Sequence, residues 1–351
     1  MYKRLLRIEC DNENAGHYQG LSAQRYTQPE HFELEKQRIF FKSWICVGHV
    51  CMAHTPGAYF VASIAGQEVI VVRDAQHRLN AFFNTCQHRG HRLATGSGHC
   101  DRLTCPYHAW SYALDGKLTN APHSEKVPGF DINQIALKRV ALDTLAGAIF
   151  INFDPDAMPL HSVFAGVEAE ILTYKPDVAE QELVYEYPMA HRCNWKASVE
   201  NFSECYHCGP VHGYLATNII DPDSYRISAQ KLVQRHVVEG RNGLSTQRLW
   251  QLWPNVAMGI YPIPDVGVCW CIRHMTPITH NESTYHYRWF CDAGGPTDAV
   301  RQYAMHHAET TGAEDALVAA QSLAGAYSIA MRSHSQTCMN VITGRRQDSS
   351  V

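Results

Sequence analysis

The chain has 351 residues, of which 45% are hydrophobic, 10% aromatic and 18% charged, and its formal net charge is −4. No basic block marks a nucleic-acid surface and no apolar run is long enough to span a bilayer, so neither kind of partner is expected. Thirteen cysteines without an apolar signal segment near the start favour free thiols and metal ligands in a cytoplasmic protein over a disulfide framework. The length is typical of two domains.

Residues 1–37 are predicted to form an arm that ends in a helix and packs on the second domain. Thr27-Gln-Pro-Glu30 matches a capping box, and the apolar residues Phe32, Ile39 and Phe40 follow at helical spacing. Short runs typical of strands then occupy residues 44–50, 58–64, 67–73, 79–84 and 147–153, with glycines and aspartates between them. Many short strands with tight turns predict a small all-β domain over residues 38–154.

Two loops of this domain carry closely spaced cysteine and histidine, namely Cys86-Gln-His88 and Cys105-Pro-Tyr-His108. Facing loops of this kind bind a tetrahedral zinc ion or a [2Fe-2S] cluster with both cysteines on one iron and both histidines on the other. The spacing and the flanking residues match the Rieske pattern. At this point the loops are compatible with a zinc-binding interaction protein or with a simple Rieske electron carrier. A simple carrier would not account for about 200 residues of the chain.

The residues beside the two loops distinguish two kinds of Rieske protein. His91 and Tyr107 occupy the positions where Rieske proteins of respiratory chains carry two additional, disulfide-bonded cysteines. A missing disulfide and a different set of hydrogen bonds around the sulfurs imply a lower potential. That potential suits an electron donor to oxygen chemistry better than a quinol oxidase.

The segment from Asn194 to His212 has the spacing of an amphipathic helix that ends at Gly209-Pro210. One face is apolar and carries Trp195, Val199, Phe202 and Tyr206. The opposite face carries Glu200, Glu204 and His207, and His212 is expected to return from the turn to face His207. Two carboxylates and two imidazoles together are costly unless a metal or water satisfies them. The alternative is a polar helix face with two chance histidines.

With the two Cys–His loops and the segment 194–212 together, the chain resembles, along nearly its whole length, the oxygenase (alpha) component of Rieske non-haem iron oxygenases. The family pattern N-W-K-x-x-x-E-N-x-x-[DE]-x-Y-H-x-x-x-x-H corresponds to residues 194–212. The resemblance implies a cluster bound by the two loops, and His207 and His212 as ligands of a mononuclear iron. The third ligand is expected at Asp315, from a downstream helix pattern Glu-Asp followed by Gln321, with Glu309 as the alternative. The implied fold is α+β: the Rieske domain, then a helix-grip catalytic domain, residues 155–351, with an antiparallel sheet flanked by helices.

Glu204 points to a branch of this family, because most ring-hydroxylating relatives carry aspartate at this position. With residues 204–210 and 253–256, it resembles the enzymes that act on choline, glycine betaine, carnitine and proline betaine. The resemblance implies hydroxylation or oxidative N-demethylation of a quaternary ammonium compound; the alternative is an aromatic ring-hydroxylating dioxygenase alpha subunit. It also implies that Glu204, in the same motif as Asn201, connects a cluster histidine of one subunit to an iron-ligand histidine of the next in a homotrimer.

The remaining expectations concern partners and the second domain. The chain has no flavin or nicotinamide fingerprint, so a separate flavin/iron–sulfur reductase is expected to deliver electrons from NAD(P)H, directly or through a ferredoxin. Alternating runs at 232–238, 244–250, 257–261, 268–275 and 283–290 predict an antiparallel sheet. Its aromatic residues are candidates for either a cation–π pocket or plain core, namely Tyr285, Tyr287, Trp289, Trp250, Trp253 and Trp270. The family continues after Gln321 with a tail rich in phenylalanine and histidine, and the last 25 or so residues of this chain depart from that pattern.

Overall fold

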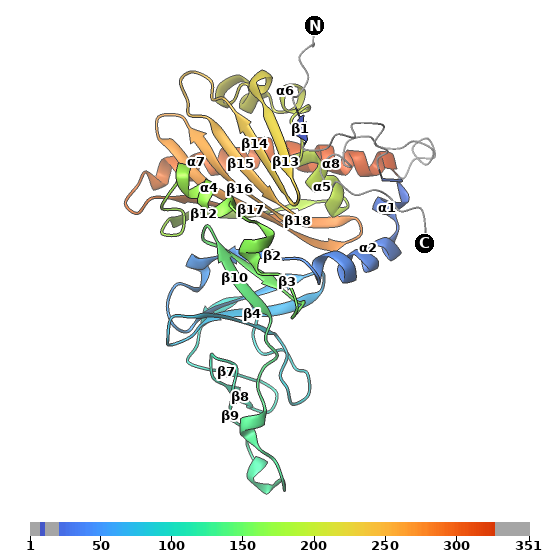
Figure 1. Cartoon of the computed structure of the whole chain (residues 1–351), viewed down its shortest axis with the longest axis vertical. Helices are drawn as coiled ribbons and strands as arrows, with labels where there is room; N and C mark the ends of the chain where they lie inside the picture. Colours follow the sequence, from blue (N-terminus) through green and yellow to red (C-terminus); the bar gives the residue numbers. More distant parts are fainter. Residues whose placement is uncertain (1–7, 11–20, 327–351) are drawn as a thin grey trace. The chain divides into compact units, whose positions relative to one another are not determined.

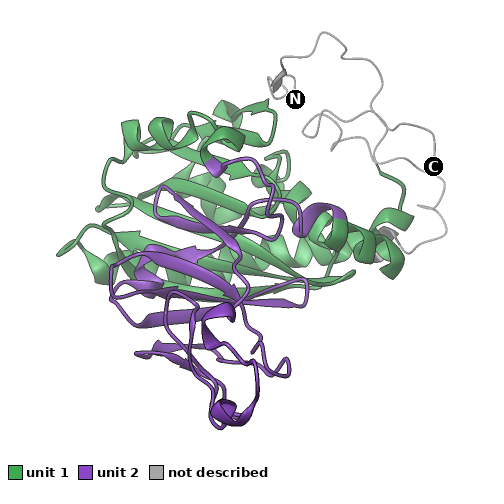
Figure 2. Ribbon diagram, turned by 60° about the horizontal axis from the view of Figure 1, so that its bottom comes forward, with its two compact units in different colours: residues 1–37, 161–351 green, residues 38–160 purple. Residues whose placement is uncertain are grey.

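The computed structural model describes residues 8–10 and 21–326. The chain divides into two compact units, Arg38–Leu160 and a second unit made of Met1–Gln37 with His161–Val351 (Figure 2). The unusual C-terminal tail noted in the sequence lies outside the described residues. Within the described part, no helix combines the length and the apolar character needed to cross a membrane.

The unit Arg38–Leu160 is built from three small antiparallel sheets. The first sheet contains β10 (Ala141–Leu145), β11 (Ala148–Asn152) and β2 (Ile45–His49). The second contains β5 (Leu79–Phe83), β4 (Gln67–Arg73), β3 (Ala58–Ile64) and β6 (Ser97–His99). The third contains β7 (Leu103–Thr104), β8 (Ser111–Tyr112) and β9 (Leu118–Asn120). Short 3-10 turns lie at η2 (Val50–Ala53), η3 (Ser124–Lys126) and η4 (Ile132–Gln134). The five predicted strand runs are confirmed, each to within one residue at either end.

The other unit is organised around one eight-stranded sheet (Figure 1). Its strands are β1 (Ile8–Cys10), β12 (Glu182–His191), β13 (Arg226–Gln230), β14 (Val233–Val238), β15 (Gln247–Leu252), β16 (Val256–Ile263), β17 (Gly267–Thr279) and β18 (Glu282–Cys291). Strands β13 to β18 are antiparallel neighbours in chain order, β12 pairs antiparallel with β18, and β1 pairs parallel with β13. The predicted antiparallel sheet is confirmed, but every residue of β16 is buried, so the expected alternation is lost there.

The remaining helical segments lie before, between and after these strands along the chain. They are α1 (Gln24–Thr27), α2 (Pro29–Glu35), η1 (Lys36–Phe40), α3 (Leu160–Val163), α4 (Val167–Tyr174), α5 (Trp195–Phe202), α6 (Cys208–Val211), η5 (Leu215–Ile219), η6 (Pro222–Ser224), α7 (Thr297–His307), η7 (Ala308–Gly312) and α8 (Ala313–Ala326). Helices α7 and α8 contact β12, and α5 contacts both α8 and β17. Figure 1 shows α7 and α8, coloured orange to red, crossing behind the large sheet.

The predicted capping box at Thr27 is wrong. Thr27 ends α1, where its hydroxyl donates to the carbonyl of Ala23 at 3.1 Å, and Gln28 rather than Thr27 occupies the position before the next helix. Helix α2 instead begins at Pro29, whose fixed φ suits the first helical position, with Gln28 preceding it. The predicted apolar face is present, since Phe32 and Phe40 are buried.

A buried ion pair fastens α2 to α5. The Lys196 ammonium lies 2.6 Å from Glu35 Oε1, and the Trp195 indole N–H donates to Glu35 Oε2 at 2.7 Å. The side chains of Lys196 and Glu35 are 5% and 13% exposed. The side chain of Asn194 caps α5 by accepting from the Lys196 amide at 3.0 Å. The Asn-Trp-Lys motif therefore holds the N-terminal helix against the helix that leads to the candidate site.

Replacement of Glu35 by alanine is expected to destabilise this unit by about 3–5 kcal/mol, because it leaves the Lys196 ammonium buried without an anion. Thermal unfolding followed by circular dichroism should show a midpoint lowered by roughly 6–20 °C. Glu33→Ala is the matched control, since Glu33 lies on the same helix but is 64% exposed and pairs only with Lys36 at the surface. Equal midpoints for the two variants would contradict the proposed fastening.

Candidate functional site

The segment that carries the site leaves the helical path earlier than its sequence predicts. Helix α5 ends at Phe202, and a turn leads to the short helix α6. At the break, the Glu204 carboxylate accepts from the backbone N–H groups of Tyr206 and of His207. Gln234 on β14 donates to the Ser203 carbonyl at 2.7 Å. Side-chain hydrogen bonds to the backbone thus compete with the helical pattern and end α5.

This turn changes the predicted faces of the segment. Trp195 and Val199 are buried as expected, but Tyr206 is 72% exposed and is not part of the apolar face. Gly209 and Pro210, which were expected to stop the helix, lie inside α6. The turn brings the Glu204 carboxylate into direct contact with the His207 ring.

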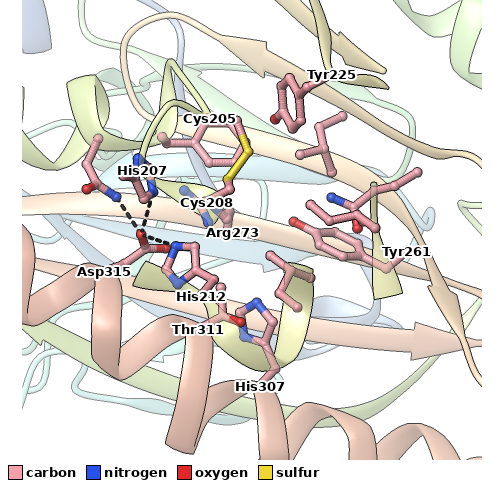
Figure 3. A pocket seen from close by; sticks show the side chains of 16 residues that line it. Cys205, His207, Cys208, His212, Tyr225, Tyr261, Arg273, His307, Thr311 and Asp315 are labelled. Atoms are coloured by element: carbon pink, nitrogen blue, oxygen red, sulfur yellow. Dashed lines mark hydrogen bonds and ion pairs between the residues drawn. A yellow bond between two sulfur atoms is a disulfide. The ribbon is translucent and has the colours of Figure 1, made fainter. Parts of the chain in front are cut away.

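Three predicted residues meet at one point. One ligand atom each from His207, His212 and Asp315 lies within 4.8 Å of the others. The Nε2 atoms of His207 and His212 lie 3.4 Å and 3.2 Å from Asp315 Oδ1 (Figure 3). Asp315 is buried in the first turn of α8, whereas Glu309, the alternative third residue, is exposed on η7. The structure therefore brings together the two histidines and Asp315, but not Glu309.

The outer nitrogen of each histidine contacts a second carboxylate. His207 Nδ1 lies 2.5 Å from Glu204 Oε1, and His212 Nδ1 lies 2.8 Å from Glu314 Oε2. A carboxylate at Nδ1 holds the proton there and leaves the Nε2 lone pair facing the point where the three residues meet. Asn201 Nδ2 donates to Asp315 Oδ1 at 2.6 Å, so the predicted motif residue Asn201 orients this carboxylate.

The pKa values of Asp315, His207 and His212 are shifted in the directions that favour their charged forms. Burial alone would raise the pKa of Asp315, but the hydrogen bonds from His207 and His212 hold it well below its usual value. Burial alone would lower the pKa of His207, but its bonds to Asp315 and Glu204 raise it to about 9. The pKa of His212 is raised against burial mainly by Asp315. In the absence of metal, both raised pKa values favour the protonated histidines, and a bound cation would displace these protons.

The group lies at the wall of a pocket between the large sheet and the helices. The lining comes from the end of α5, the turn before α6, η5, strands β15 to β17, and the α7–α8 region. Its aromatic side chains are Phe202, Tyr225 and Tyr261. None of the six aromatic residues expected from the sequence lines this pocket: Tyr285, Tyr287, Trp289, Trp250, Trp253 and Trp270 are absent from its wall. Arg273 of β17 also lines it (Figure 3).

One disulfide departs from the expectation of free thiols. Cys205 and Cys208 are joined across the turn between α5 and α6, with their Cα atoms 5.0 Å apart. Both residues line the pocket (Figure 3). The turn that ends α5 places these two side chains on the same side of the backbone, which a sequence spacing of three does not reveal. The other cysteines whose side chains the structure describes form no disulfide.

In the other unit, the two Cys–His loops have the same backbone construction. The amide of Cys86 bonds to the carbonyl five residues ahead at 2.9 Å, and its carbonyl accepts from Gly90 at 3.0 Å. The amide of Cys105 likewise bonds to the carbonyl of Trp110 at 2.8 Å, and its carbonyl accepts from Ala109 at 3.0 Å. Gly90 and Ala109 both have positive φ, which closes each loop.

These loops expose their histidines and bury their cysteines. Cys86 and Cys105 are 1% and 2% exposed, whereas the rings of His88 and His108 lie at the surface with their centroids 4.7 Å apart. The Tyr112 hydroxyl lies 3.3 Å from Cys86 Sγ. Two buried thiols below two exposed imidazoles fit a two-iron cluster with a cysteine iron inside and a histidine iron outside.

Aromatic packing replaces a covalent link between the two loops. His91 and Tyr107 occupy the two positions where respiratory Rieske proteins have cysteines, and their ring centroids are 5.6 Å apart. Tyr107 also packs on His108, with centroids 3.7 Å apart. The loops therefore contact each other through rings at these positions.

Sequence reasoning missed two residues of the pocket region. Glu314 was recognised only as the first residue of the Glu-Asp pair, although its contact with His212 matches that of Glu204 with His207. Arg273 was not recognised, although a charged residue inside the apolar run Cys-Trp-Cys-Ile-Arg was a usable signal.

Two family models match the chain, one in each of the two compact units. A family model described as Rieske [2Fe-2S] domain matches residues 43–131. A second, described as ring hydroxylating alpha subunit (catalytic domain), matches residues 178–243. The first match favours an iron–sulfur cluster over zinc at the Cys–His loops, and the two domains together imply a cluster and a catalytic iron.

Curated proteins and a solved structure resemble this chain. The chain is 40% identical over 193 residues to the carnitine monooxygenase oxygenase subunit of Escherichia coli (strain K12), which covers 55% of this chain and 52% of that protein. It is 34% identical over 199 residues to the glycine betaine monooxygenase oxygenase subunit of Chromohalobacter salexigens, covering 56% and 44%. The chain thus spans about half the length of the curated relatives it matches. The crystal structure of the quaternary ammonium Rieske monooxygenase CntA with L-carnitine matches with a TM-score of 0.81 and 27% identity, covering 90% of this chain and 87% of that one.

Proposed function

Because the chain belongs to the Rieske non-haem iron oxygenases, we propose that it is the oxygenase component of a multicomponent system that hydroxylates or oxidatively N-demethylates a small quaternary ammonium compound. The observation that carries this proposal is the meeting of His207, His212 and Asp315 at the wall of a pocket. Two imidazoles and one carboxylate are the ligand set of iron enzymes that leave positions open for dioxygen.

The first metal group is a [2Fe-2S] cluster held in the Arg38–Leu160 unit. Cys86 and Cys105 would bind one iron, and His88 and His108 the other. A bound cluster of this type supplies single electrons. The Tyr112 hydroxyl, within hydrogen-bond distance of Cys86 Sγ, would contribute to the potential of the cluster.

The second group is a mononuclear iron at His207, His212 and Asp315. When bound, ferrous iron supplies the activation of dioxygen. The protein residues prepare this site: Glu204 and Glu314 fix the tautomers of the two histidines, and Asn201 orients Asp315. The pocket beside the three ligands would receive the substrate.

Glu204 is proposed as the connection between subunits. In a single chain it contacts the iron-ligand histidine His207 on one side, and it is still 33% exposed. A carboxylate accepts hydrogen bonds from two imidazole N–H groups at once, so the exposed side is suited to a cluster histidine of a neighbouring subunit. The proposal includes a homotrimer and a separate flavin/iron–sulfur reductase that passes electrons from NAD(P)H, directly or through a ferredoxin.

The proposed substrate class rests on Glu204, on the motifs at residues 204–210 and 253–256, and on the similarity to carnitine and glycine betaine monooxygenase subunits. The pocket also contains the buried charge of Arg273, which suits a polar substrate better than an aromatic hydrocarbon. The buried charge therefore disfavours the aromatic dioxygenase alternative, and the choice of a quaternary ammonium substrate rests on the motifs and the similar proteins.

The proposed function is tested by substrate turnover. The full chain, loaded with iron and cluster, is supplied with NADH and a surrogate reductase, and incubated with glycine betaine, carnitine, choline, proline betaine, benzoate or biphenyl. We expect substrate-dependent oxygen consumption with a quaternary ammonium compound, together with formaldehyde or a hydroxylated product. Turnover of the ring compounds alone would refute the proposed class. A colourless, zinc-containing protein without acid-labile sulfide would refute the cluster.

A further inference from the structure

The pocket contains a buried cation without an anionic partner. Arg273 is only 5% exposed, and its Nε has no hydrogen-bond partner. Within the described part of the chain, its guanidinium makes no hydrogen bond and no ion pair with any residue. Arg288, the buried arginine of the adjacent strand β18, shows the usual arrangement: its guanidinium bonds to Glu186 at 3.1 Å and to His274 at 3.0 Å. The contrast indicates that the partner of Arg273 is supplied from outside these residues.

Aromatic rings hold the Arg273 guanidinium in place without using its donors. It lies 3.6 Å from the ring centroid of Phe202, 5.2 Å from that of Tyr285 and 5.6 Å from that of Tyr287. These cation–π contacts stabilise the charge and fix its position. Ring faces do not satisfy the five N–H donors that a guanidinium presents in a planar fork. The donors therefore remain available to a ligand in the pocket.

The acidic residue Asp315, which interacts electrostatically with Arg273, already contacts other residues. Asp315 contributes to the electrostatic surroundings of Arg273, but its Oδ1 faces two histidines and accepts from Asn201. Burial alone would lower the pKa of Arg273, yet Asp315 and the neighbouring tyrosines raise it, so the charge is retained. A second cation placed on the rings of Tyr285 or Tyr287 would be repelled by the guanidinium that occupies them.

We propose that Arg273 binds the carboxylate of the substrate, so that the substrate is a zwitterion with a quaternary ammonium group and a carboxylate, of the betaine or carnitine type, and not a simple cation such as choline. A planar guanidinium pairs with a carboxylate through two parallel hydrogen bonds. The ammonium end then faces the aromatic pocket residues Tyr225 and Tyr261. This inference rests on the proposed function, because it assumes a quaternary ammonium substrate.

Three ligands separate the two charged ends of the substrate. Glycine betaine has both charges, choline has only the ammonium, and 3,3-dimethylbutanoate replaces the ammonium by a carbon of the same shape but keeps the carboxylate. Binding to the full chain, loaded with iron and cluster, is measured by calorimetry without dioxygen or reductase, so that no turnover occurs. We expect choline to bind roughly 10- to 100-fold more weakly than glycine betaine, as for the loss of charge-assisted hydrogen bonds.

Two variants of Arg273 assign this preference to the guanidinium. Arg273→Met keeps the length and removes the charge, and it should abolish the preference for glycine betaine over choline. Arg273→Lys keeps a charge without the fork and should retain part of the preference. Arg288→Met is the matched control, because Arg288 is a buried arginine of the same sheet outside the pocket, and its loss should leave the ratio unchanged. Iron content and circular dichroism report whether each variant is folded.

The outcomes test the carboxylate site at Arg273 separately from the proposed quaternary ammonium substrate. If choline binds the wild type as tightly as glycine betaine does, the carboxylate site is refuted, even if Arg273→Met does not fold. The proposed function survives that result when both quaternary compounds bind more tightly than 3,3-dimethylbutanoate. If 3,3-dimethylbutanoate binds as tightly as glycine betaine in an Arg273-dependent way, the carboxylate site stands and the quaternary ammonium substrate is refuted.

Discussion

Replacement of Asp315 by alanine is expected to remove the mononuclear iron and all detectable oxygenase activity while the Rieske absorbance remains. Asp315 is the only carboxylate whose oxygen faces both His207 Nε2 and His212 Nε2 within the described residues. Two imidazoles alone form a much weaker iron site. Metal analysis should therefore fall from about three iron ions per chain to about two, the number in the cluster.

The neighbouring residue Glu309 provides the control for this substitution. It is exposed on η7, one turn and a half before Asp315, and it was the alternative third ligand from the sequence. Glu309→Ala should keep the full iron content and activity. A fully iron-loaded, active Asp315→Ala protein would show that the third ligand lies elsewhere, and a loss of iron in Glu309→Ala would point to that residue.

Much of the fold could be predicted because its strands are marked locally. The segments that became β3 and β4 are rich in β-branched and aromatic residues and are followed within two residues by glycine or aspartate, so their limits were predicted to the residue. Strand β12 was missed, because Pro188 and two glutamates interrupt its apolar pattern. Its place at the edge of the sheet explains why proline is tolerated there, but edge position is a property of the assembled sheet.

The candidate site was predicted in its residues but not in its backbone. Ligand spacing identified His207 and His212, since metal chemistry constrains which side chains occur together. The turn that ends α5 depends on Gln234, which comes from β14 and is distant in the sequence. The local sequence likewise does not show that Arg273 lacks a hydrogen-bonded partner. Arg288 is a similar buried arginine on the adjacent strand, and it differs in having Glu186 and His274 as partners in the folded structure.

Glu204→Gln is expected to stop electron transfer between the cluster and the iron site. Both oxygens of Glu204 accept hydrogen bonds, Oε1 from His207 Nδ1 and Oε2 from the backbone amides of Tyr206 and His207. A glutamine has one acceptor oxygen, so its NH₂ must face one of these donors. It also lacks the charge needed to hold a second imidazole of a neighbouring subunit. The cluster should still be reduced by the reductase, but stopped-flow absorbance should show it persisting in the presence of substrate and dioxygen.

Glu314→Gln separates this effect from a change in the iron site itself. Glu314 contacts His212 Nδ1 as Glu204 contacts His207 Nδ1, and the two carboxylates are similarly exposed, 36% and 33%. Both substitutions should weaken iron binding by roughly 10- to 100-fold, since each removes a carboxylate that orients a ligand. With iron restored in excess, only Glu204→Gln should reoxidise its cluster slowly. Equal, fast reoxidation in both variants would reduce Glu204 to a residue that orients His207, and the inference of a homotrimer would lose its support from this chain.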